Sequence, residues 1–568
     1  MGTTFELRPI KTSTPLANVC KVLHLPPKQG TVTGFTLDSR AVRSGDLYAA
    51  LPGEHTHGAN FAAQAIAAGA AAIVTDMAGA QIIGDVAVPV LVVPVPREAL
   101  GAVANCVYSG PRPRLVGVTG TNGKTTTTHG IAAVADAVAV PTAILGTLGV
   151  RFRDIATASG RTTPEAPELH AALQAVAESG AEVAAMEVSS HALALHRVDG
   201  LRFEVAVFLG LSQDHLDFHH TMREYFEAKA RLFDARVSRR AVINIDDAWG
   251  RELATRAAIP HVTYAVSTEA DWTARDVAVG ADGITSFTAV GPGTTVRVRM
   301  SMPGGFNVAN ALAALAAAQL LELDLDAAAR GLADMRVPGR FEFIANDRGV
   351  AAYADYAHTP DAVRRVLDVA RGVTRGRLIT VIGCGGDRDP VKRPLMAAAA
   401  VAASDAVIIT DDNPRSEDPI DIMNDVMVGL RRFDTTCVFE PDRAKAIRTA
   451  LGEAKAGDIV LLAGVIALLP LTGTWNFHGL QGWAADLDAH ALLQDLVAVF
   501  DQAQCAPLRL FPKSAWEYAQ EYAKRQDADA ALDEAANRWR PDYETDGITP
   551  EADDPSYRAC FGHEADAL

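Results

Sequence analysis

Short apolar runs alternate with longer helical patterns along most of the chain. The runs at residues 114–120, 181–188 and 203–211 are rich in valine, alanine, leucine and phenylalanine, as in strands buried on both faces of a sheet. The segments 59–71 and 121–138 are rich in alanine or carry helical spacing. Such alternation predicts an α/β protein with mostly parallel sheets that are covered by helices on both faces.

The same pattern divides the chain into three α/β units and a tail. A single core rarely exceeds about 250–300 residues, so a chain of 568 residues should contain several domains. We place the domains at residues 1–108, 109–338 and 339–464, with a glycine- and proline-marked junction at Pro338 and Gly339. Residues 465–568 have no clean period and are assigned to no core.

Composition narrows the class of protein. Hydrophobic residues make up 49% and charged residues 21%, as in ordinary globular proteins. A formal charge of −17 argues against an extended nucleic-acid-binding face. Six cysteines form no C-x-x-C pair, which fits a reducing compartment. Residues 1–11 lack the apolar stretch of a signal peptide, and the apolar run 459–471 is shorter than the roughly 20 residues of a membrane span. We expect a cytoplasmic monomer that binds neither nucleic acid nor membrane.

A glycine-rich turn joins a strand pattern to a helix pattern at residues Gly120, Thr121, Asn122, Gly123, Lys124, Thr125 and Thr126. Backbone N–H groups of such a turn bind phosphates, while Lys124 neutralises their charge and the Thr125 hydroxyl can hold Mg²⁺. In the usual G-x-x-x-x-G-K-[ST] pattern the first glycine would stand at Val118, so this turn is a variant. It predicts an ATP or GTP site, and the alternative is a glycine turn without a ligand.

The variant turn resembles that of the Mur ligase family and its folylpolyglutamate synthase relatives. Further motifs resemble, in the expected order, the branch that adds the third residue to UDP-N-acetylmuramoyl-dipeptide: T-T-P-E-A at 162–166, M-E-V-S-S-H at 186–191, D-H-L-D at 214–217, F-E-A-K-A at 226–230, F-N-V-A-N at 306–310, D-Y-A-H-T-P-D at 355–361 and D-D-N-P-R at 411–415. The resemblance covers about residues 30–464. It implies a UDP-substrate-binding N-terminal domain, a central P-loop ATPase domain and a Rossmann-like C-terminal domain.

The resemblance implies ATP and two Mg²⁺ ions as cofactors. Thr125, Glu187 and His215 match metal ligands, and Lys229 matches a lysine that is carbamylated and supports the metal. Arg340 matches an arginine that reaches the γ-phosphate from the third domain. Five residues match the adenosine end of the site: Asn244, Asp246, Asp247, Asn307 and Asn310. The alternatives are a packed glutamate and histidine, a solvated lysine, and asparagines and aspartates that cap turns and helices.

The substrate residues follow from the same resemblance. Ser39 and Arg40 match the uridine diphosphate site, and the muramoyl-peptide site is matched by Thr162, Thr163, Ser189 and Arg197. The motif Asp412-Asn413-Pro414-Arg415 accompanies meso-2,6-diaminopimelate, whose distal carboxylate suits the guanidinium fork, with Arg388 and Gly464 as further contacts. The implied reaction transfers phosphate from ATP to the carboxylate of UDP-N-acetylmuramoyl-L-alanyl-D-glutamate. The amine of diaminopimelate then displaces that phosphate, in peptidoglycan precursor synthesis.

The chain departs from the family in two places. A K-G-H-E segment should follow Gly464, but residues 465–468 are valine, isoleucine, alanine and leucine. A changed reading frame or a lineage-specific replacement would each explain this loss. Lysine addition, a catalytically impaired nucleotide-binding protein and a folate-type polyglutamate ligase therefore stay open as alternatives. Gly210 stands where relatives carry asparagine, so an adenine-side contact is in question.

Overall fold

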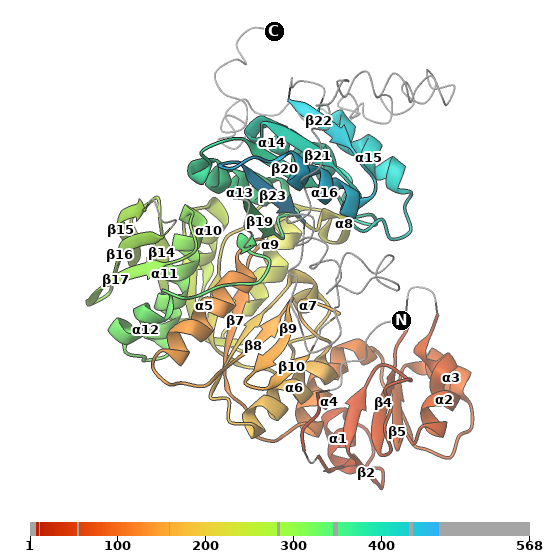
Figure 1. Cartoon of the computed structure of the whole chain (residues 1–568). Coiled ribbons are helices and arrows are strands. Elements are labelled where there is room, and N and C mark those ends of the chain that lie inside the picture. Colours follow the sequence, from red (N-terminus) through yellow and green to blue (C-terminus); the bar gives the residue numbers. More distant parts are fainter. Residues whose placement is uncertain are drawn as a thin grey trace, which may run out of the picture. The chain divides into compact units, whose positions relative to one another are not determined.

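The computed structural model describes residues 7–10, 12–53, 56–157, 160–280, 284–344, 350–430 and 435–464. The chain divides into two compact units, one of Met1–Thr435 with Phe439–Ala506 and one of Thr436–Val438 with Pro507–Leu568. The first unit contains the three α/β domains (Figure 1). The predictions for residues 465–568 lie outside the described residues.

The N-terminal domain is a parallel sheet of four strands in the order β3-β4-β5-β6. The strands are β3 (Gly34–Thr36), β4 (Asp46–Ala50), β5 (Ala72–Thr75) and β6 (Val90–Val92), and the short antiparallel pair β1 (Thr14–Pro15) and β2 (Thr31–Val32) precedes them. The helices are α1 (Leu16–Val22), η1 (Gly58–Phe61), α2 (Ala62–Ala67), α3 (Met77–Ile83) and α4 (Pro96–Val107). Every residue of β4 is buried because hydrophobic clusters lie on both faces of the sheet.

The central domain is built on an eleven-stranded sheet in the order β10-β9-β8-β11-β7-β12-β13-β14-β15-β16-β17. Its parallel core consists of β7 (Arg114–Thr119), β8 (Thr142–Gly146), β11 (Val183–Glu187), β12 (Phe203–Phe208), β13 (Ser238–Asn244) and β14 (His261–Ala265). The strands β9 (Gly149–Phe152) and β10 (Ile155–Thr157) add an antiparallel margin on one side. On the other side β15 (Trp272–Val279) pairs in parallel with β14 and antiparallel with β16 (Thr285–Gly291), which pairs antiparallel with β17 (Thr294–Met300). The mostly parallel sheet that the sequence predicts is thus confirmed, with antiparallel strands added at its margins.

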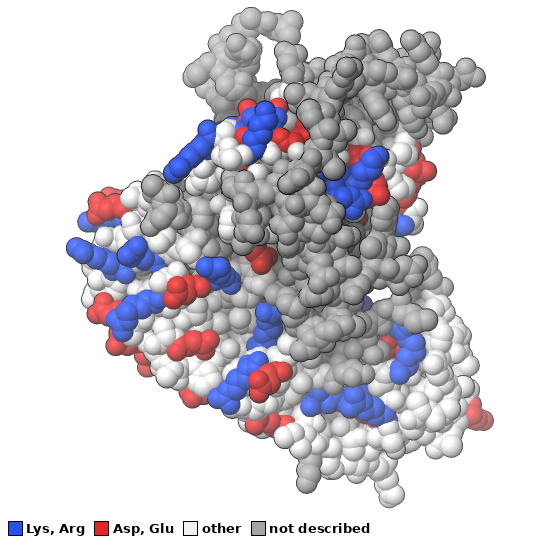
Figure 2. Space-filling view, in the orientation of Figure 1, with Lys and Arg blue, Asp and Glu red and all other residues white. Residues whose placement is uncertain are grey.

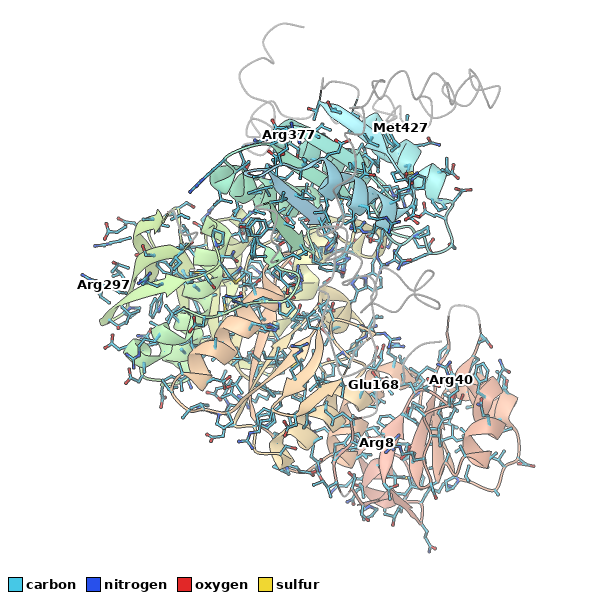
Figure 3. All side chains as sticks on the ribbon, in the orientation of Figure 1. Arg8, Arg40, Glu168, Arg297, Arg377 and Met427 are labelled. Atoms are coloured by element: carbon cyan, nitrogen blue, oxygen red, sulfur yellow. The ribbon has the colours of Figure 1, made fainter. Side chains whose placement is uncertain are left out.

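The antiparallel margin follows from the sequence pattern. In β17 buried residues alternate with exposed ones, and Arg297 lies on this outermost strand (Figure 3). Such alternation belongs to strands with one solvated face, whereas strands of a covered parallel sheet are apolar throughout. The margin could therefore have been recognised from its period of two.

Helices cover both faces of the central sheet. They are α5 (Lys124–Asp136), α6 (Ala166–Glu178), α7 (Ser190–Ala194), α8 (Leu216–His219), α9 (Met222–Ala230), η2 (Arg231–Phe233), α10 (Ala248–Arg256), α11 (Gly305–Leu320) and α12 (Leu325–Gly331). Val116 and Val118 of β7 pack with α5 and α11, and Leu115 packs in the cluster that contains α6. Successive side chains of a strand point to opposite faces, so β7 contributes to two cores.

The C-terminal domain has a sheet with the strand order β18-β19-β23-β20-β21. Its strands are β18 (Glu342–Ile344), β19 (Ala351–Asp355), β20 (Leu378–Ile382), β21 (Ala406–Ile409) and β23 (Ile459–Ala463), and its helices are α13 (Pro360–Val373), α14 (Lys392–Ala403), α15 (Pro419–Val428) and α16 (Arg443–Glu453). The strand β22 (Thr436–Phe439) belongs mostly to the second compact unit. The apolar run that starts at Ile459 begins as a fully buried strand. Within the described residues, no helix combines the length and apolar character needed to cross a bilayer.

Charged side chains are interspersed on the surface. On the face shown in Figure 2, the coloured lysine and arginine side chains lie among aspartate and glutamate side chains in small groups. Many are paired, as Arg256 is with Glu227 at 2.7 Å and with Glu252 at 2.9 Å. Exposed pairs of this kind contribute at most about 1 kcal/mol each, so the fold depends mainly on its buried apolar clusters.

Candidate active site

The phosphate-binding turn lies at the carboxyl end of β7, where open α/β sheets bind ligands. Gly123 precedes α5 with φ +84°, and a β-carbon there would come within 2.5 Å of the side-chain oxygen of Asn310. Glycine is therefore required. Lys124 Nζ donates to the carbonyl oxygens of Gly120 (2.9 Å) and Thr121 (2.8 Å), so its ammonium lies across the turn.

A cavity of about 480 Å³ adjoins this turn and collects the residues predicted for the adenosine end. Its walls include Thr121, Asn122, Gly123, Thr126, Asn244, Asp246, Asp247, Asn307, Asn310 and Arg340. Several of them also order the walls. Asp247 accepts from the backbone N of Gly250 at 2.6 Å and of Leu211 at 2.7 Å, and Asp246 accepts from Val266 N at 2.9 Å. Asp246 and Asp247 thus cap backbone N–H groups, as the alternative interpretation of these residues proposed, and they also line the cavity.

Gly210 lies on the wall of the same cavity. Its φ is +114°, and a β-carbon would come within 2.7 Å of Asp247 Oδ2. Its carbonyl accepts from Thr121 N at 3.1 Å. The glycine that replaces the family's asparagine therefore supports the turn through its backbone.

Thr125 connects the central domain to the third domain. Its hydroxyl donates to Glu187 Oε1 at 3.0 Å and accepts from Arg340 Nη2 at 2.9 Å. Glu187 is almost fully buried, and Thr147 fixes it through its backbone N at 2.8 Å and its hydroxyl at 3.2 Å. The Arg340 guanidinium lies 4.8 Å from the ring centroid of Tyr356. A carboxylate and a guanidinium thus meet on the hydroxyl of the phosphate-binding turn.

His215 and Lys229 both lie near the ring of Tyr225, whose hydroxyl is 3.2 Å from Thr121 Oγ1 in the turn. Burial lowers the pKa of His215 well below its usual value; the charge of Asp214 opposes this shift, while those of His191, Lys229 and Lys124 add to it. Lys229 Nζ donates to Gly120 O at 3.0 Å, and burial lowers its pKa well below the usual range. The pKa of Lys124 is lowered by burial and raised in part by Glu187 and Asp214. The structure therefore brings Lys124, Glu187, His215 and Lys229 together.

These residues fit a magnesium ion that is shared with phosphate. No group of three or more histidine, cysteine, aspartate or glutamate side chains that could hold a metal by itself occurs in the described part of the chain. Mg²⁺ in nucleotide enzymes is usually held by one or two protein ligands, with phosphates and water completing its coordination. Glu187 with a neutral His215 suits such an ion.

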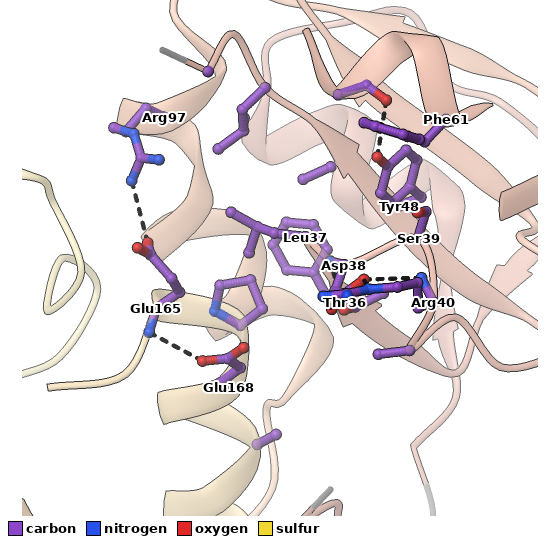
Figure 4. A pocket seen from close by; sticks show the side chains of 18 of the residues that line it. Thr36, Leu37, Asp38, Ser39, Arg40, Tyr48, Phe61, Arg97, Glu165 and Glu168 are labelled. Atoms are coloured by element: carbon purple, nitrogen blue, oxygen red, sulfur yellow. Dashed lines mark hydrogen bonds and ion pairs between the residues drawn. The ribbon is translucent and has the colours of Figure 1, made fainter. Parts of the chain in front are cut away.

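A second cavity, of about 820 Å³, contains the residues predicted for uridine diphosphate (Figure 4). Ser39 and Arg40 both line it. Ser39 Oγ donates to Gln64 Oε1 at 3.1 Å, while Arg40 forms a two-pronged pair with Asp38 and stays 62% exposed. Arg40 therefore lies on the wall of the cavity, where its guanidinium is already paired with the carboxylate of Asp38.

The residues predicted for the muramoyl-peptide lie beside Glu187. Thr163 Oγ1 donates to Glu187 O at 2.8 Å and accepts from Ser189 N at 3.1 Å, and Arg197 Nη1 donates to Thr163 O at 3.4 Å. Thr162 lies apart from this chain of bonds, with its hydroxyl 3.2 Å from that of Thr147.

Sequence reasoning missed the glutamate that positions Arg197. Glu165 Oε1 lies 3.0 Å from Arg197 Nε, and its other oxygen accepts from Arg97 of the N-terminal domain at 3.2 Å (Figure 4). Its position in the T-T-P-E-A motif was the available signal. Thr147, which fixes Glu187, gave no such signal.

The third domain brings its predicted amino-acid-binding residues together at the ends of β20, β21 and β23. Arg388 and Arg415 both expose part of their side chains, and Arg415 has φ +52° and donates to Gly386 O. Burial lowers the pKa of Arg415, and the nearby charge of Arg388 lowers it further. Two guanidiniums this close favour a carboxylate ligand between them.

The remaining residues of this motif order the turn. Asn413 accepts from Arg415 N at 3.3 Å through its side chain and from Gly386 N at 2.8 Å through its carbonyl, and Pro414 O accepts from Glu417 N at 3.0 Å. Asp412 is partly buried, and its desolvation raises its pKa. Gly464 follows β23 with φ +82°, and a β-carbon there would lie 3.9 Å from Asp412 Oδ2.

Family models match all three domains. The Mur ligase family catalytic domain matches residues 31–108, the Mur ligase middle domain matches 118–318, and the Mur ligase glutamate ligase domain matches 339–466. A model of the RecC C-terminal domain matches residues 424–523, so it overlaps the third Mur domain and extends into residues outside the described part.

Relatives and a solved structure agree with these matches. A Streptomyces coelicolor protein named UDP-N-acetylmuramoyl-L-alanyl-D-glutamate--2,6-diaminopimelate ligase is 46% identical over 80% of this chain and 92% of its own. A protein of the same name from Solibacter usitatus is 41% identical over 83% of this chain and 94% of its own. A solved structure of an enzyme of that name covers 86% of this chain and 99% of its own, with 32% identity and a TM-score of 0.58. The chain therefore belongs to the Mur ligase family, in the branch of the diaminopimelate ligases.

Proposed function

We propose that this chain is the ATP-dependent ligase that joins meso-2,6-diaminopimelate to UDP-N-acetylmuramoyl-L-alanyl-D-glutamate in peptidoglycan precursor synthesis. The relatives that it matches over most of their length carry this activity in their names. The observation that carries the proposal is the meeting of Glu187 and Arg340 on the Thr125 hydroxyl. That arrangement would place the γ-phosphate and the acceptor carboxylate close together, where positive charge from Arg340 and bound metal ions would offset their repulsion.

The first step requires that two anions approach each other. Mg²⁺, for which we propose two ions, would supply positive charge that offsets the repulsion between these anions. Lys124 and Arg340 neutralise charge on the phosphates, which is the main contribution a protein makes to phosphoryl transfer. Thr125, Glu187 and His215 would hold the ions, and we propose that Lys229 is carbamylated and would support them. Arg340 reaches this point from the third domain, so closure of that domain accompanies phosphate transfer.

The sugar-peptide substrate would occupy the cavity of about 820 Å³ and extend towards Glu187. Ser39 and Arg40 would contact its nucleotide end, and Thr162, Thr163, Ser189 and Arg197 would contact its peptide end. Glu165 Oε1 lies 3.0 Å from Arg197 Nε, and Thr163 O accepts from Arg197 Nη1 at 3.4 Å, so the guanidinium is held from two sides. A rigid guanidinium positions a carboxylate for attack better than a flexible one.

The amine donor would bind to the third domain. Arg388 and Arg415 together suit the distal carboxylate that diaminopimelate has and lysine lacks. Asp412, with Asn413 and Gly464, would face the ammonium end, while Pro414 shapes the turn. We expect Arg415→Met to raise the KM for diaminopimelate at least about tenfold, since a charged hydrogen bond contributes about 1.5–3 kcal/mol.

Phosphate release tests the proposal. The purified protein is assayed with ATP, Mg²⁺ and the UDP-dipeptide, with diaminopimelate, lysine or no amino acid. Diaminopimelate should stimulate release strongly. Stimulation by lysine instead would reverse the specificity, and stimulation by glutamate with a folate substrate would favour the polyglutamate ligase.

A catalytically impaired protein is the second candidate, because the K-G-H-E segment is missing after Gly464. Residues 465–468 lie outside the described part of the chain. Nucleotide binding without amide formation would favour this candidate, whereas turnover with a low KM for diaminopimelate would reject it.

The domain limits 1–108, 109–338 and 339–464, the monomeric state and the cytoplasmic location are proposals of the same kind. Limited proteolysis and sedimentation would check the first two. Protease cleavage near residues 108 and 338 should leave stable fragments.

A further inference from the structure

A buried ion pair joins the third domain to the central domain beside the metal-binding residues. Lys392 Nζ lies 3.5 Å from Asp214 Oδ1, and the two side chains are only 9% and 4% exposed. Lys392 is the first residue of α14, and Asp214 directly precedes His215. Neither has a part in the functional assignments made so far.

Asp214 acts in two directions at once. Its Oδ1 accepts from the backbone N of His215 at 3.0 Å, and its Oδ2 lies 3.3 Å from His215 Nε2. The same carboxylate faces Lys392 from the third domain. A shift of α14 would therefore change the position of Asp214 and, through it, that of the His215 imidazole.

Lys392 stands between the nucleotide side and the amino-acid side. The pKa of His358, which lines the nucleotide cavity, falls to about 4 through burial and then through the charge of Lys392. On the amino-acid side, burial raises the pKa of Asp412, and Arg443, Arg415 and Lys392 oppose that rise. One ammonium is thus close to both subsites.

A buried ion pair is a poor way to gain stability. Both charges lose their hydration, and well-packed apolar residues often replace such a pair at no loss of stability. What a single pair does provide is one defined relative position of the elements that it joins. Here those elements belong to two domains that must meet during the reaction.

We propose that the Asp214–Lys392 pair is a positioning contact. It keeps the third domain against the central domain between formation of the acyl phosphate and attack by the amine. This inference rests on the proposed function. Without the pair the third domain would separate more often, and water instead of the amine would attack the acyl phosphate. That attack regenerates the carboxylate and releases phosphate, so ATP is spent without an amide.

The test compares amide formed with ADP released, using Lys392→Met in the full-length chain. The wild type should form close to one amide per ADP. In the variant we expect that ratio to fall to about one half or less and the KM for diaminopimelate to rise about fivefold or more, because the approach of amine and acyl phosphate is no longer held in place. The KM for ATP should change less than about twofold, since Arg340 and the turn are untouched.

Two controls separate positioning from general damage. Lys445→Met removes an exposed lysine of the same domain and should leave the ratio unchanged. Lys392→Arg keeps the charge and should retain most of the coupling. Thermal melting of each variant detects loss of the fold, and the comparison of arginine with methionine stays informative if the Asp214 variants do not fold.

A double substitution decides whether Lys392 acts through Asp214. If it does, Lys392→Met should change the ratio by less than about twofold in an Asp214→Asn background, because interacting residues are not additive. An equal loss in both backgrounds would mean that Lys392 touches the phosphate directly, and would overturn the inference. A fully coupled Lys392→Met enzyme would overturn it too, whereas a wild type that forms no amide with diaminopimelate would defeat the proposed function instead.

Discussion

Replacing Arg340 with methionine should lower kcat strongly but lower the free energy of unfolding only slightly. In the folded protein Arg340 donates one hydrogen bond to Thr125 Oγ1 at 2.9 Å and stacks over Tyr356 at 4.8 Å. A hydrogen bond contributes about 0.5–1.5 kcal/mol and a cation–π contact about 0.5–1 kcal/mol, so unfolding should become easier by about 1–2.5 kcal/mol. Loss of one preorganised donor at a developing anion costs about 10²–10³ in kcat, or about 3–4 kcal/mol.

The assay is phosphate release at saturating substrates, with the KM for ATP measured in parallel. We expect kcat to fall at least about a hundredfold while that KM changes less than about threefold, because the charge acts mainly on the transition state. Arg336→Met is the matched control, since Arg336 is exposed and four residues away. A kcat within threefold of the wild type would refute the role of Arg340, as would an equal loss in the control.

Three further changes test other parts of the structure. Burial and the neighbouring Arg112 lower the pKa of His170 to about 3. Its contribution to stability is thus complete above pH 6.5 and is lost as the pH falls towards 3, by about 3 kcal/mol at pH 4. His170→Gln should flatten this acid limb in urea unfolding, and an unchanged limb would contradict the assignment. Gly210→Ala should raise the KM for ATP about fivefold, since a β-carbon at φ +114° meets Asp247 and such strain costs about 1–3 kcal/mol. An unchanged KM for ATP would contradict the role of Gly210 in the wall of the nucleotide cavity. Lys229→Ala should lose activity that added formate partly restores, as a carboxylate can stand in for a carbamate, and rescue by chloride alone would speak against carbamylation.

Some of the site is readable in the sequence because it depends on local geometry. The turn from Gly120 to Thr126 needs only a strand, glycines and a helix start, all of which are neighbours in the chain. The succession of apolar runs likewise indicates α/β domains, since strand and helix periods are local properties. The antiparallel margin at β15–β17 was not predicted, although the alternation in β17 carried that information.

Contacts between distant residues are a different matter. The family resemblance predicted that Arg340 approaches the γ-phosphate, but not that it binds the Thr125 hydroxyl, 215 positions away. Nothing in the residue order indicates that Glu165 would bind both Arg97 and Arg197. The pairing of Lys392 with Asp214 is equally invisible, because an isolated lysine at a helix start is usually solvated.

The sequence by itself determined the family, the phosphate-binding turn and the residue types available for phosphate, metal and carboxylate binding, because these depend on neighbours in the chain. Only the tertiary structure decided which of those side chains share a carboxylate, a hydroxyl or a cavity wall. The physical reason is that packing of whole sheets and helices sets distances between residues far apart in sequence, and burial then sets their pKa values.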